Sequence, residues 1–292
     1  MSITYACGLF GYDRQVYYRS ISRVKHHQQR AEKVVSLVNS VRIRMPRLGA
    51  KKLYNILKSE LKDLGVGRDK LIDILRANYL LIKPKRQYHV TTNSHHRFRK
   101  HKNLIEHTEV ERPEQIWVSD ITYIGDRENP QYLALVTDSY SKKIMGYDVC
   151  NSLNVAGSCR ALKMALKNRM YPSKALIHHS DRGLQYCSDA YQEILKSADL
   201  KCSMTEKYDP YQNATAERIN GILKQEFILG IKVNDINLMR KIVEQSVMIY
   251  NKERPHLSCY MNTPKFMHTQ SLIKIKTYKR KRVEENDPLL VI

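Results

Sequence analysis

Three carboxylates, those of Asp120, Asp181 and Glu217, stand in sequence contexts where an acid has no evident structural purpose. Asp120 and Asp181 lie in apolar, β-branched runs, IWVSDITYI and KALIHHSDRG, which are typical of buried strands. Glu217 opens a helical pattern, and 35 residues separate it from Asp181. Because an unpaired carboxylate in a protein interior is costly, we expect a cation or hydrogen bonds to compensate these acids.

Two Asp and one Glu side chain suit divalent-metal chemistry on phosphodiesters. That chemistry uses two hard cations about 3.5–4 Å apart, one at the attacking oxygen and one at the leaving oxygen. Oxygen ligands favour Mg²⁺ or Mn²⁺, and water and substrate phosphate complete the coordination. We therefore predict two ions per active site, with Asp120 as the bridging ligand and with Asp181 and Glu217 each holding one ion. The alternative is that Asp181 caps a turn and Glu217 is a surface acid.

The sequence also predicts roles for other polar residues near these acids. Lys224 follows Glu217 by two helical turns, so we predict that its ammonium contacts a nucleic-acid backbone, against the alternative of a solvated lysine. Asp138 is followed by the turn-like run SYSKK, which favours a capping role over metal binding. Asn213 stands where a helix N-cap is expected. His178 and His179 are expected to be sheet residues rather than ligands.

The chain is strongly basic. Its 50 Lys and Arg residues against 29 Asp and Glu give a formal net charge of +21, which predicts a polyanionic partner. Residues 1–103 hold 23 basic and 6 acidic side chains, and residues 274–282 hold six basic ones. The segment with the three acids is therefore nearly neutral. This distribution is expected when one part of a protein grips a nucleic-acid backbone and another part performs chemistry.

The cysteines and the hydrophobic runs indicate the compartment. The six cysteines have neither paired nor zinc-ligand spacing, so we expect reduced thiols in a cytosolic protein. No run approaches about 18 consecutive apolar residues, and the N-terminus has no apolar signal core, so no membrane partner is expected.

Residues 1–84 are expected to form a basic helical DNA-binding region. Leucines recur at helical spacing in GAKKLYNILKSELKDLG, and two glycines separate this run from RDKLIDILRANYLL. This pattern predicts a helix-turn-helix over about residues 49–81, with Arg68 and Lys70 as DNA contacts at the start of its second helix. The alternative is a small helical bundle with a solvated basic face. A shorter signal around Gly11 is interpreted as the remnant of a second such unit.

Residues 85–112 are predicted to be a basic connector, because hydrophobic periodicity fades there. Arg97, Arg99 and Lys100 are assigned as DNA contacts within it. Residues 113–232 are expected to form the catalytic core, and residues 233–292 a C-terminal helix and basic tail.

The core alternates strand-like and helical runs. IWVSDITYI, QYLALVTDSY and KIMGYDVC are three strand-like runs with short turns, which predict an antiparallel meander. Helix, strand, helix, strand and helix follow, which indicates a mixed α/β sheet. In this order the strand with Asp120 can lie beside the strand with Asp181, so that their carboxylates meet at one edge where Glu217 joins them.

Five segments between residues 113 and 265 resemble the catalytic reading frame of the bacterial transposases named after insertion sequence three. They are PEQIWVSDITYI, VTDSYSKKIMGYDV, LIHHSDRGLQYCS, DPYQNATAERINGILKQEF and YNKERPHLSCYMNTP. These transposases belong to the integrase and transposase superfamily with a ribonuclease-H-like fold. The basic front also resembles the helix-turn-helix region that precedes the core in that family.

The resemblance implies Asp120, Asp181 and Glu217 as catalytic acids and Lys224 as the basic residue that follows the glutamate. It implies attack of water or a 3′-hydroxyl on a phosphodiester without a covalent protein intermediate. The implied partners are double-stranded DNA, with its insertion-element terminal repeats and target, and further copies of the chain. The implied location is the bacterial cytoplasm at the nucleoid. No zipper heptads are present, so an upstream frame is a possible fusion partner.

Two other functions are compatible with parts of the sequence. A DNA-binding regulator would use only the helical front and would keep its function after Asp120→Ala. A metal nuclease of the same fold would hydrolyse DNA without joining it. A precut oligonucleotide with a free 3′ end separates a nuclease from a transposase, because only the latter yields joined product.

Overall fold

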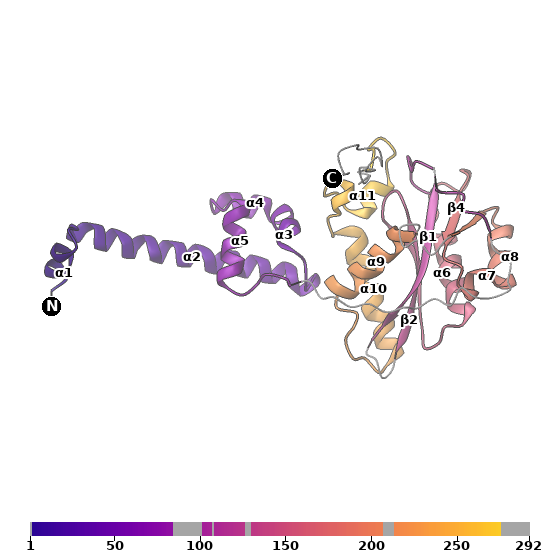
Figure 1. The fold of residues 1–292 in the computed structure, drawn as a ribbon, viewed down its shortest axis with the longest axis horizontal. Coiled ribbons are helices and arrows are strands. Elements are labelled where there is room, and N and C mark those ends of the chain that lie inside the picture. Colours follow the sequence, from indigo (N-terminus) through magenta and orange to yellow (C-terminus); the bar gives the residue numbers. More distant parts are fainter. Residues whose placement is uncertain (1, 84–100, 107, 126–129, 207–212, 276–292) are drawn as a thin grey trace, which may run out of the picture.

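The protein has an N-terminal helical region and a mixed α/β core (Figure 1). The computed structural model describes residues 2–83, 101–106, 108–125, 130–206 and 213–275. The helices of the first region are α1 Ile3–Leu9, α2 Arg14–Arg44, α3 Ala50–Ile56, α4 Lys58–Asp63 and α5 Arg68–Ala77. Among the described residues, no helix is long and apolar enough to cross a bilayer.

The longest helix, α2, projects away from the core and carries α1 at its far end (Figure 1). Asp13 caps its first turn by accepting a hydrogen bond from the Gln15 amide. Gly11 turns the chain between α1 and α2 with a φ of +68°, a conformation that favours glycine. However, none of the residues of α1 is buried. The predicted remnant of a second helix-turn-helix is therefore wrong as a packed unit, because neither helix covers the other's apolar side chains.

Helices α3, α4 and α5 pack against the second half of α2. The sequence predicted one helix over the first leucine run, whereas the structure breaks it at Leu57, whose φ of −93° and ψ of 20° leave the helical region. Gly65 then turns the chain with a φ of +62° before α5. The shared core of this bundle consists of Val34, Val38, Leu53, Leu57, Leu61, Leu71 and Leu75. Its leucines are those whose helical spacing marked the region in the sequence, together with two valines of α2.

The core contains a five-stranded sheet in the order β3-β2-β1-β4-β5. Its strands are β1 Ile116–Ile124, β2 Gln131–Asp138, β3 Ile144–Cys150, β4 Ile177–Ser180 and β5 Lys201–Met204. The first three pair in antiparallel fashion, while β4 and β5 join in parallel with β1. The predicted meander and the predicted neighbourhood of the β1 and β4 strands are confirmed. This strand order, with helices on both faces, is a ribonuclease-H-like fold.

Helices cover both faces of the sheet. They are α6 Val155–Lys167, α7 Leu184–Cys187, α8 Asp189–Ser197, α9 Ala214–Glu226, α10 Ile236–Lys252 and α11 Pro264–His268, with a short 3₁₀ turn, η2, at Leu257–Cys259. Side chains of β2 alternate between the faces: Leu133 and Leu135 join α9 and α10, while Ala134 and Val136 join α6 and α8. A Cβ at Gly146 of β3 would lie 2.1 Å from the Ala161 carbonyl oxygen, so only glycine permits α6 to approach this closely.

Glu226, at the C-terminal end of α9, connects the two regions. Its carboxylate accepts hydrogen bonds from Lys52 Nζ at 2.6 Å and from Arg254 Nε and Nη2 at 2.7 and 2.8 Å. Its carbonyl oxygen also accepts the Arg47 amide at 3.0 Å. Lys52 and Arg47 belong to the helical region, and Arg254 follows α10, so one acid joins three separate segments.

Candidate active site

The register of β1 and β4 brings Asp120 and Asp181 together. These parallel strands pair Ser119 with Ser180, so the two acids are the next residues along neighbouring strands. Asp120 is still within β1, whereas Asp181 comes directly after the last residue of β4. Asp181 Oδ1 accepts the Gly183 amide at 3.0 Å, which fixes its carboxylate at the start of the following turn. Both acids thus stand at the edge of the sheet where parallel strands end.

Helix α9 places Glu217 beside this edge. It packs on β1, and Asn220 Nδ2 donates to Asp120 Oδ2 at 2.7 Å. Glu217 precedes Asn220 by three residues, and Lys224 follows Asn220 by four, so the three side chains form one stripe on the helix. Asn220 was missed by the sequence reasoning, although its spacing from Glu217 is a usable signal for the same helix face.

The carboxylates act on one another electrostatically. Burial and the negative charge of Asp181 raise the pKa of Asp120 to about 7, although hydrogen bonds from Asn220 and from the Ile121 amide oppose that rise. The charge of Glu217 raises it further. Burial and the charge of Asp181 also raise the pKa of Glu217. Each acid therefore lies within the field of another, and ionisation of the group is unfavourable in the absence of a cation.

Lys224 is the basic residue beside this group. Burial lowers the pKa of its ammonium, and the negative charge of Asp120 partly offsets that effect. The shared helix face of Glu217 and Lys224 is thus observed, and Lys224 is near enough to Asp120 for their charges to interact.

The donor set suits a hard divalent cation, but no complete ligand cage is formed. All the donors are carboxylate oxygens, and their mutual repulsion would be relieved by a bound cation. Within the part of the chain that the structure describes, no group of three or more His, Cys, Asp or Glu side chains is arranged to hold a metal ion. The residues therefore fit a metal in chemical type and charge, while the assignment of Asp120, Asp181 and Glu217 as ligands remains a prediction.

Asn213 differs from its expected role. It occupies the N-cap position of α9, but its side chain makes no capping hydrogen bond. Its φ of −120° and ψ of 22° are not the extended conformation typical of a capping residue. Instead, Asn213 Nδ2 donates to the Ser119 carbonyl oxygen at 3.2 Å. This bond fastens the start of α9 to the strand residue that precedes Asp120.

The structure confirms the capping role of Asp138 and the positions of His178 and His179 within the sheet. Asp138 Oδ1 accepts from the Ser141 amide at 2.7 Å and closes the turn after β2. His178 Nε2 contacts the Ser119 hydroxyl at 2.8 Å, and His179 Nδ1 contacts the Ser203 hydroxyl at 2.9 Å. Both rings are buried within the sheet layers, so they are sheet residues.

The predicted DNA contacts lie in three different settings. Arg68 starts α5, is well exposed and pairs with Asp69 at 2.9 Å. Lys70 lies two residues further along α5 and is half-buried. Arg97, Arg99 and Lys100 fall outside the described residues.

Two family models match this chain, and both describe an integrase core domain. One spans residues 110–210, which include Asp120 and Asp181, and the other spans residues 198–264, which include Glu217. The class defined by the sheet and its acidic edge is thus the integrase core.

Two relatives identify the family to which this chain belongs. The chain is 33% identical over 259 residues to the "Insertion element IS600 uncharacterized 31 kDa protein" of Shigella sonnei, and that match covers 86% of this chain and 92% of the relative. It is 34% identical over 200 residues to "Transposase InsF for insertion sequence IS3fB" of Escherichia coli (strain K12), covering 68% and 69% of the two chains. The chain belongs to the family of bacterial insertion-sequence transposases named after IS3.

Solved structures with similar folds are retroviral. The catalytic core domain of HTLV-2 integrase, in a structure with magnesium, aligns with 54% of this chain and 97% of its own at 19% identity and a TM-score of 0.42. An integrase chain in the simian T-cell lymphotropic virus intasome aligns over 79% and 78% at 17% identity and a TM-score of 0.48.

Proposed function

We propose that this chain cleaves DNA at the ends of an insertion element and joins the resulting 3′ end to another DNA strand, with Asp120, Asp181 and Glu217 as its catalytic acids. The observation that carries the proposal is the pairing of β1 with β4, which makes Asp120 and Asp181 neighbours, and the packing of α9 on β1, which brings the charge of Glu217 close to them. A buried acid in the field of two others is costly for a fold and useful for binding a cation.

Two Mg²⁺ or Mn²⁺ ions per active site fit the chemistry of the donor set, and Asp120, Asp181 and Glu217 are the residues that would hold them. When bound, such ions activate an attacking oxygen and stabilise the leaving oxygen of a phosphodiester. The protein positions the acids: Asn220 fixes the orientation of the Asp120 carboxylate through its 2.7 Å hydrogen bond. Asn213 holds the start of α9 on β1, which keeps Glu217 at the edge of the sheet.

The reaction consists of two displacements at phosphorus. Water first attacks a phosphodiester at the element end, the P–O3′ bond breaks, and the 3′ oxygen leaves as a hydroxyl. That hydroxyl then attacks a second phosphodiester, forming a new P–O bond and releasing another 3′ end. Lys224 contacts a phosphate of the strand next to the acids, where its ammonium opposes the negative charge of the DNA.

Recognition of the element ends is assigned to the basic helical region. Arg68 and Lys70, at the start of α5, contact DNA there, and Arg97, Arg99 and Lys100 contact the phosphate backbone. The protein acts on the DNA of the bacterial nucleoid. Because two element ends must be brought together, the chain assembles into a homo-oligomer on DNA. Light scattering with and without end duplexes checks this assembly, and an unchanged monomer in both would contradict it.

A strand-transfer assay tests the chemistry. A precut duplex with a free 3′ end and a labelled target is incubated with Mg²⁺ or Mn²⁺ and with either the intact protein or Glu217→Gln. Joined product from the intact protein and none from the variant supports the proposal. Shortened DNA without joined product would instead identify a hydrolytic nuclease.

A further inference from the structure

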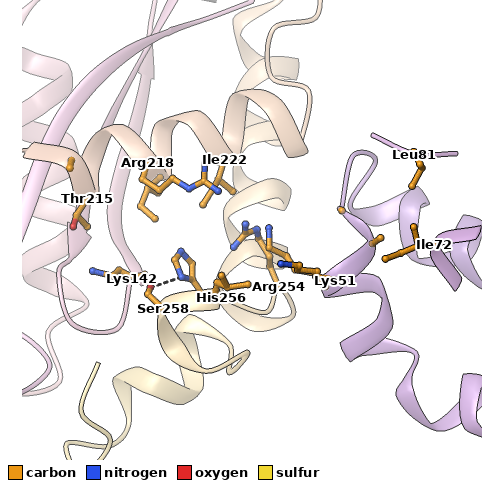
Figure 2. Close-up of a pocket in the computed structure, with 16 residues that line it drawn as sticks. Lys51, Ile72, Leu81, Lys142, Thr215, Arg218, Ile222, Arg254, His256 and Ser258 are labelled. Carbon is orange, nitrogen blue, oxygen red and sulfur yellow. Dashed lines mark hydrogen bonds between the residues drawn. The ribbon is translucent and has the colours of Figure 1, made fainter. Parts of the chain in front are cut away.

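A cavity of about 800 Å³ lies between the helical region and the core (Figure 2). Its walls come from four places: the start of α3 with α5 and the residues after it, helix α9, the turn between β2 and β3, and the residues after α10. Arg218 and Ile222 of α9 stand across from Ile72 and Leu81 of the helical region in Figure 2. The cavity thus adjoins the helix of Glu217 without including the three acids.

The side chains around this cavity are strongly cationic. Lys51, Lys52, Lys142, Arg218 and Arg254 line it, and no acidic residue is among the described residues of its lining. Glu226, outside the lining, pairs with Lys52 and Arg254. One carboxylate therefore serves two of the cations, and the cavity retains an excess of positive charge that attracts an anion.

His256 gives the cavity a buried polar group without a protein partner. The residue is only 7% exposed, and its Nδ1 contacts the Ser258 hydroxyl at 2.8 Å. Its Nε2 is buried and has no hydrogen-bond partner among the described residues. Burial and the charges of Arg254 and Lys142 lower the pKa of His256 to about 2, so the ring is neutral at physiological pH. In the tautomer in which Nδ1 accepts from the Ser258 hydroxyl, Nε2 carries the proton and can donate it to a ligand.

The remaining walls are aliphatic. Ile72 and Leu81 line the side formed by the helical region, and Ile219, Ile222 and Leu257 line the side formed by the core. An inorganic anion alone would leave these surfaces without a partner. A nucleotide joins a phosphate, which suits the cations, to a sugar and base with large apolar faces.

We infer that this cavity binds one nucleotide of a DNA strand, with its phosphate against Arg218, Lys51 and His256 Nε2 and its sugar and base against the aliphatic walls. The inference rests on the proposed function only in that the DNA strand is the one engaged by the core. It adds a binding site shared by the recognition region and the catalytic helix, so that a strand held there contacts both at once.

Binding of a labelled single-stranded oligonucleotide to paired variants tests the site. Lys51→Gln with Arg218→Gln removes two exposed charges from the cavity, and Lys163→Gln with Lys167→Gln removes two exposed charges from α6 on the other face of the sheet. We expect the cavity pair to raise Kd about tenfold and the control pair to raise it less than about twofold, because only the former removes charge-assisted hydrogen bonds. Equal losses in the two pairs would overturn the inference.

Photocrosslinking identifies the ligand in the unaltered protein. An oligonucleotide with 4-thiothymidine is crosslinked, and the modified peptides are located by mass spectrometry. Crosslinks within residues 254–258 or 214–222 that unlabelled oligonucleotide removes, and that millimolar thymidine monophosphate leaves in place, support a DNA strand. Removal by the mononucleotide to the same extent overturns that assignment in favour of a free nucleotide, and crosslinks confined to other peptides overturn the site.

These measurements do not depend on catalysis. If the cavity pair binds like the intact protein while Glu217→Gln abolishes strand transfer, the cavity assignment fails and the proposed chemistry stands. If the cavity pair binds weakly and the intact protein joins no DNA, the proposed chemistry fails and the binding site stands.

Discussion

Two acidic sites in this chain have opposite electrostatic surroundings. Glu114, which precedes β1, is fully buried and accepts hydrogen bonds from the Met170 and Tyr171 amides and from Arg169 and His268. Burial by itself would raise the pKa of Glu114, but the hydrogen bond from His268 and those from the two amides lower it to about 2. Its charge is thus fully compensated by the fold.

Asp120 lies a few residues further along the chain, and its pKa is shifted in the opposite direction. Burial and the charge of Asp181 raise the pKa of Asp120 to about 7, and its carboxylate accepts hydrogen bonds from the Asn220 side chain and from the Ile121 amide. Structural acids in this protein therefore carry their counter-charges with them, whereas the acids at the edge of the sheet face further acids. That difference separates an acid that stabilises the fold from the acids to which we assign cation binding.

The largest expected effect is on strand transfer. Glu217→Gln and Asp120→Asn should each lower the rate of joining at least about a thousandfold, because each removes a ligand on which several kcal/mol of charge stabilisation depends. Binding of end duplexes should persist. Glu193→Gln, an exposed acid of α8, is the control and should leave joining unchanged. Joining by either acid variant at the normal rate would contradict the catalytic assignment.

The second effect is on stability and should distinguish the two groups. Glu114→Gln should lower the free energy of unfolding by about 3–5 kcal/mol, because it leaves Arg169 without its buried counter-charge and His268 with Asp138 alone. Asp120→Asn should leave that free energy unchanged or raise it, because it removes an uncompensated charge. Urea unfolding in metal-free buffer measures both, and equal destabilisation of the two variants would refute the contrast.

The pH dependence of stability should have opposite signs for the two acids. The pKa of Glu114 is lowered from 4.5 to about 2, so its contribution is present above 4.5 and is lost as the pH falls towards 2. Protonation of Glu114 should lower the free energy of unfolding by on the order of 3 kcal/mol. The pKa of Asp120 is raised from 3.8 to about 7, so the folded state binds the extra proton and gains stability as the pH falls from 7 to 3.8.

Variants separate these two contributions. In metal-free urea unfolding, Asp120→Asn should remove the gain in stability between pH 7 and 3.8 and keep the loss at lower pH. Glu114→Gln should keep the gain in stability between pH 7 and 3.8 and remove the loss at lower pH. An unchanged pH profile in Asp120→Asn would mean that its carboxyl titrates normally.

The smallest effect concerns Lys224, the cation whose charge interacts with that of Asp120. Lys224→Gln should weaken binding of an end duplex about tenfold, because it removes one charge-assisted contact with phosphate. Titrations with labelled duplex measure this change. Lys241→Gln, an exposed lysine of α10, is the matched control and should change Kd less than about twofold. Equal losses in the two variants would indicate general electrostatic attraction rather than a placed contact.

The sheet could be predicted because its signals are local. Strand runs, their turns and their order along the chain follow from patterns of apolar residues, and these imply that the strand with Asp120 lies beside the strand with Asp181. The same holds for the helical leucine spacing of the bundle. The acids could be selected because an acid in an apolar run is costly and therefore conspicuous.

The partners of those acids depend on contacts between distant segments. Asn220 is 100 positions from Asp120 in the sequence, and Asn213 is 94 positions from Ser119. A local sequence pattern therefore cannot predict either hydrogen bond. The break at Leu57 depends on tertiary packing that overrides the helical propensity of the run. The compensation of Glu114 depends on His268, which is 154 positions away.

Helix α9 has consequences for protein engineering because an acid stands near each of its ends. Glu217 and Glu226 are nine residues apart, which corresponds to about 14 Å along a helix axis. Glu226 receives Lys52 and the Arg47 amide from the helical region. A chimera that exchanges this region for a foreign recognition module must therefore supply a cation at the place of Lys52. Without it, α9 no longer fixes the distance between the helical region and the acids at the edge of the sheet.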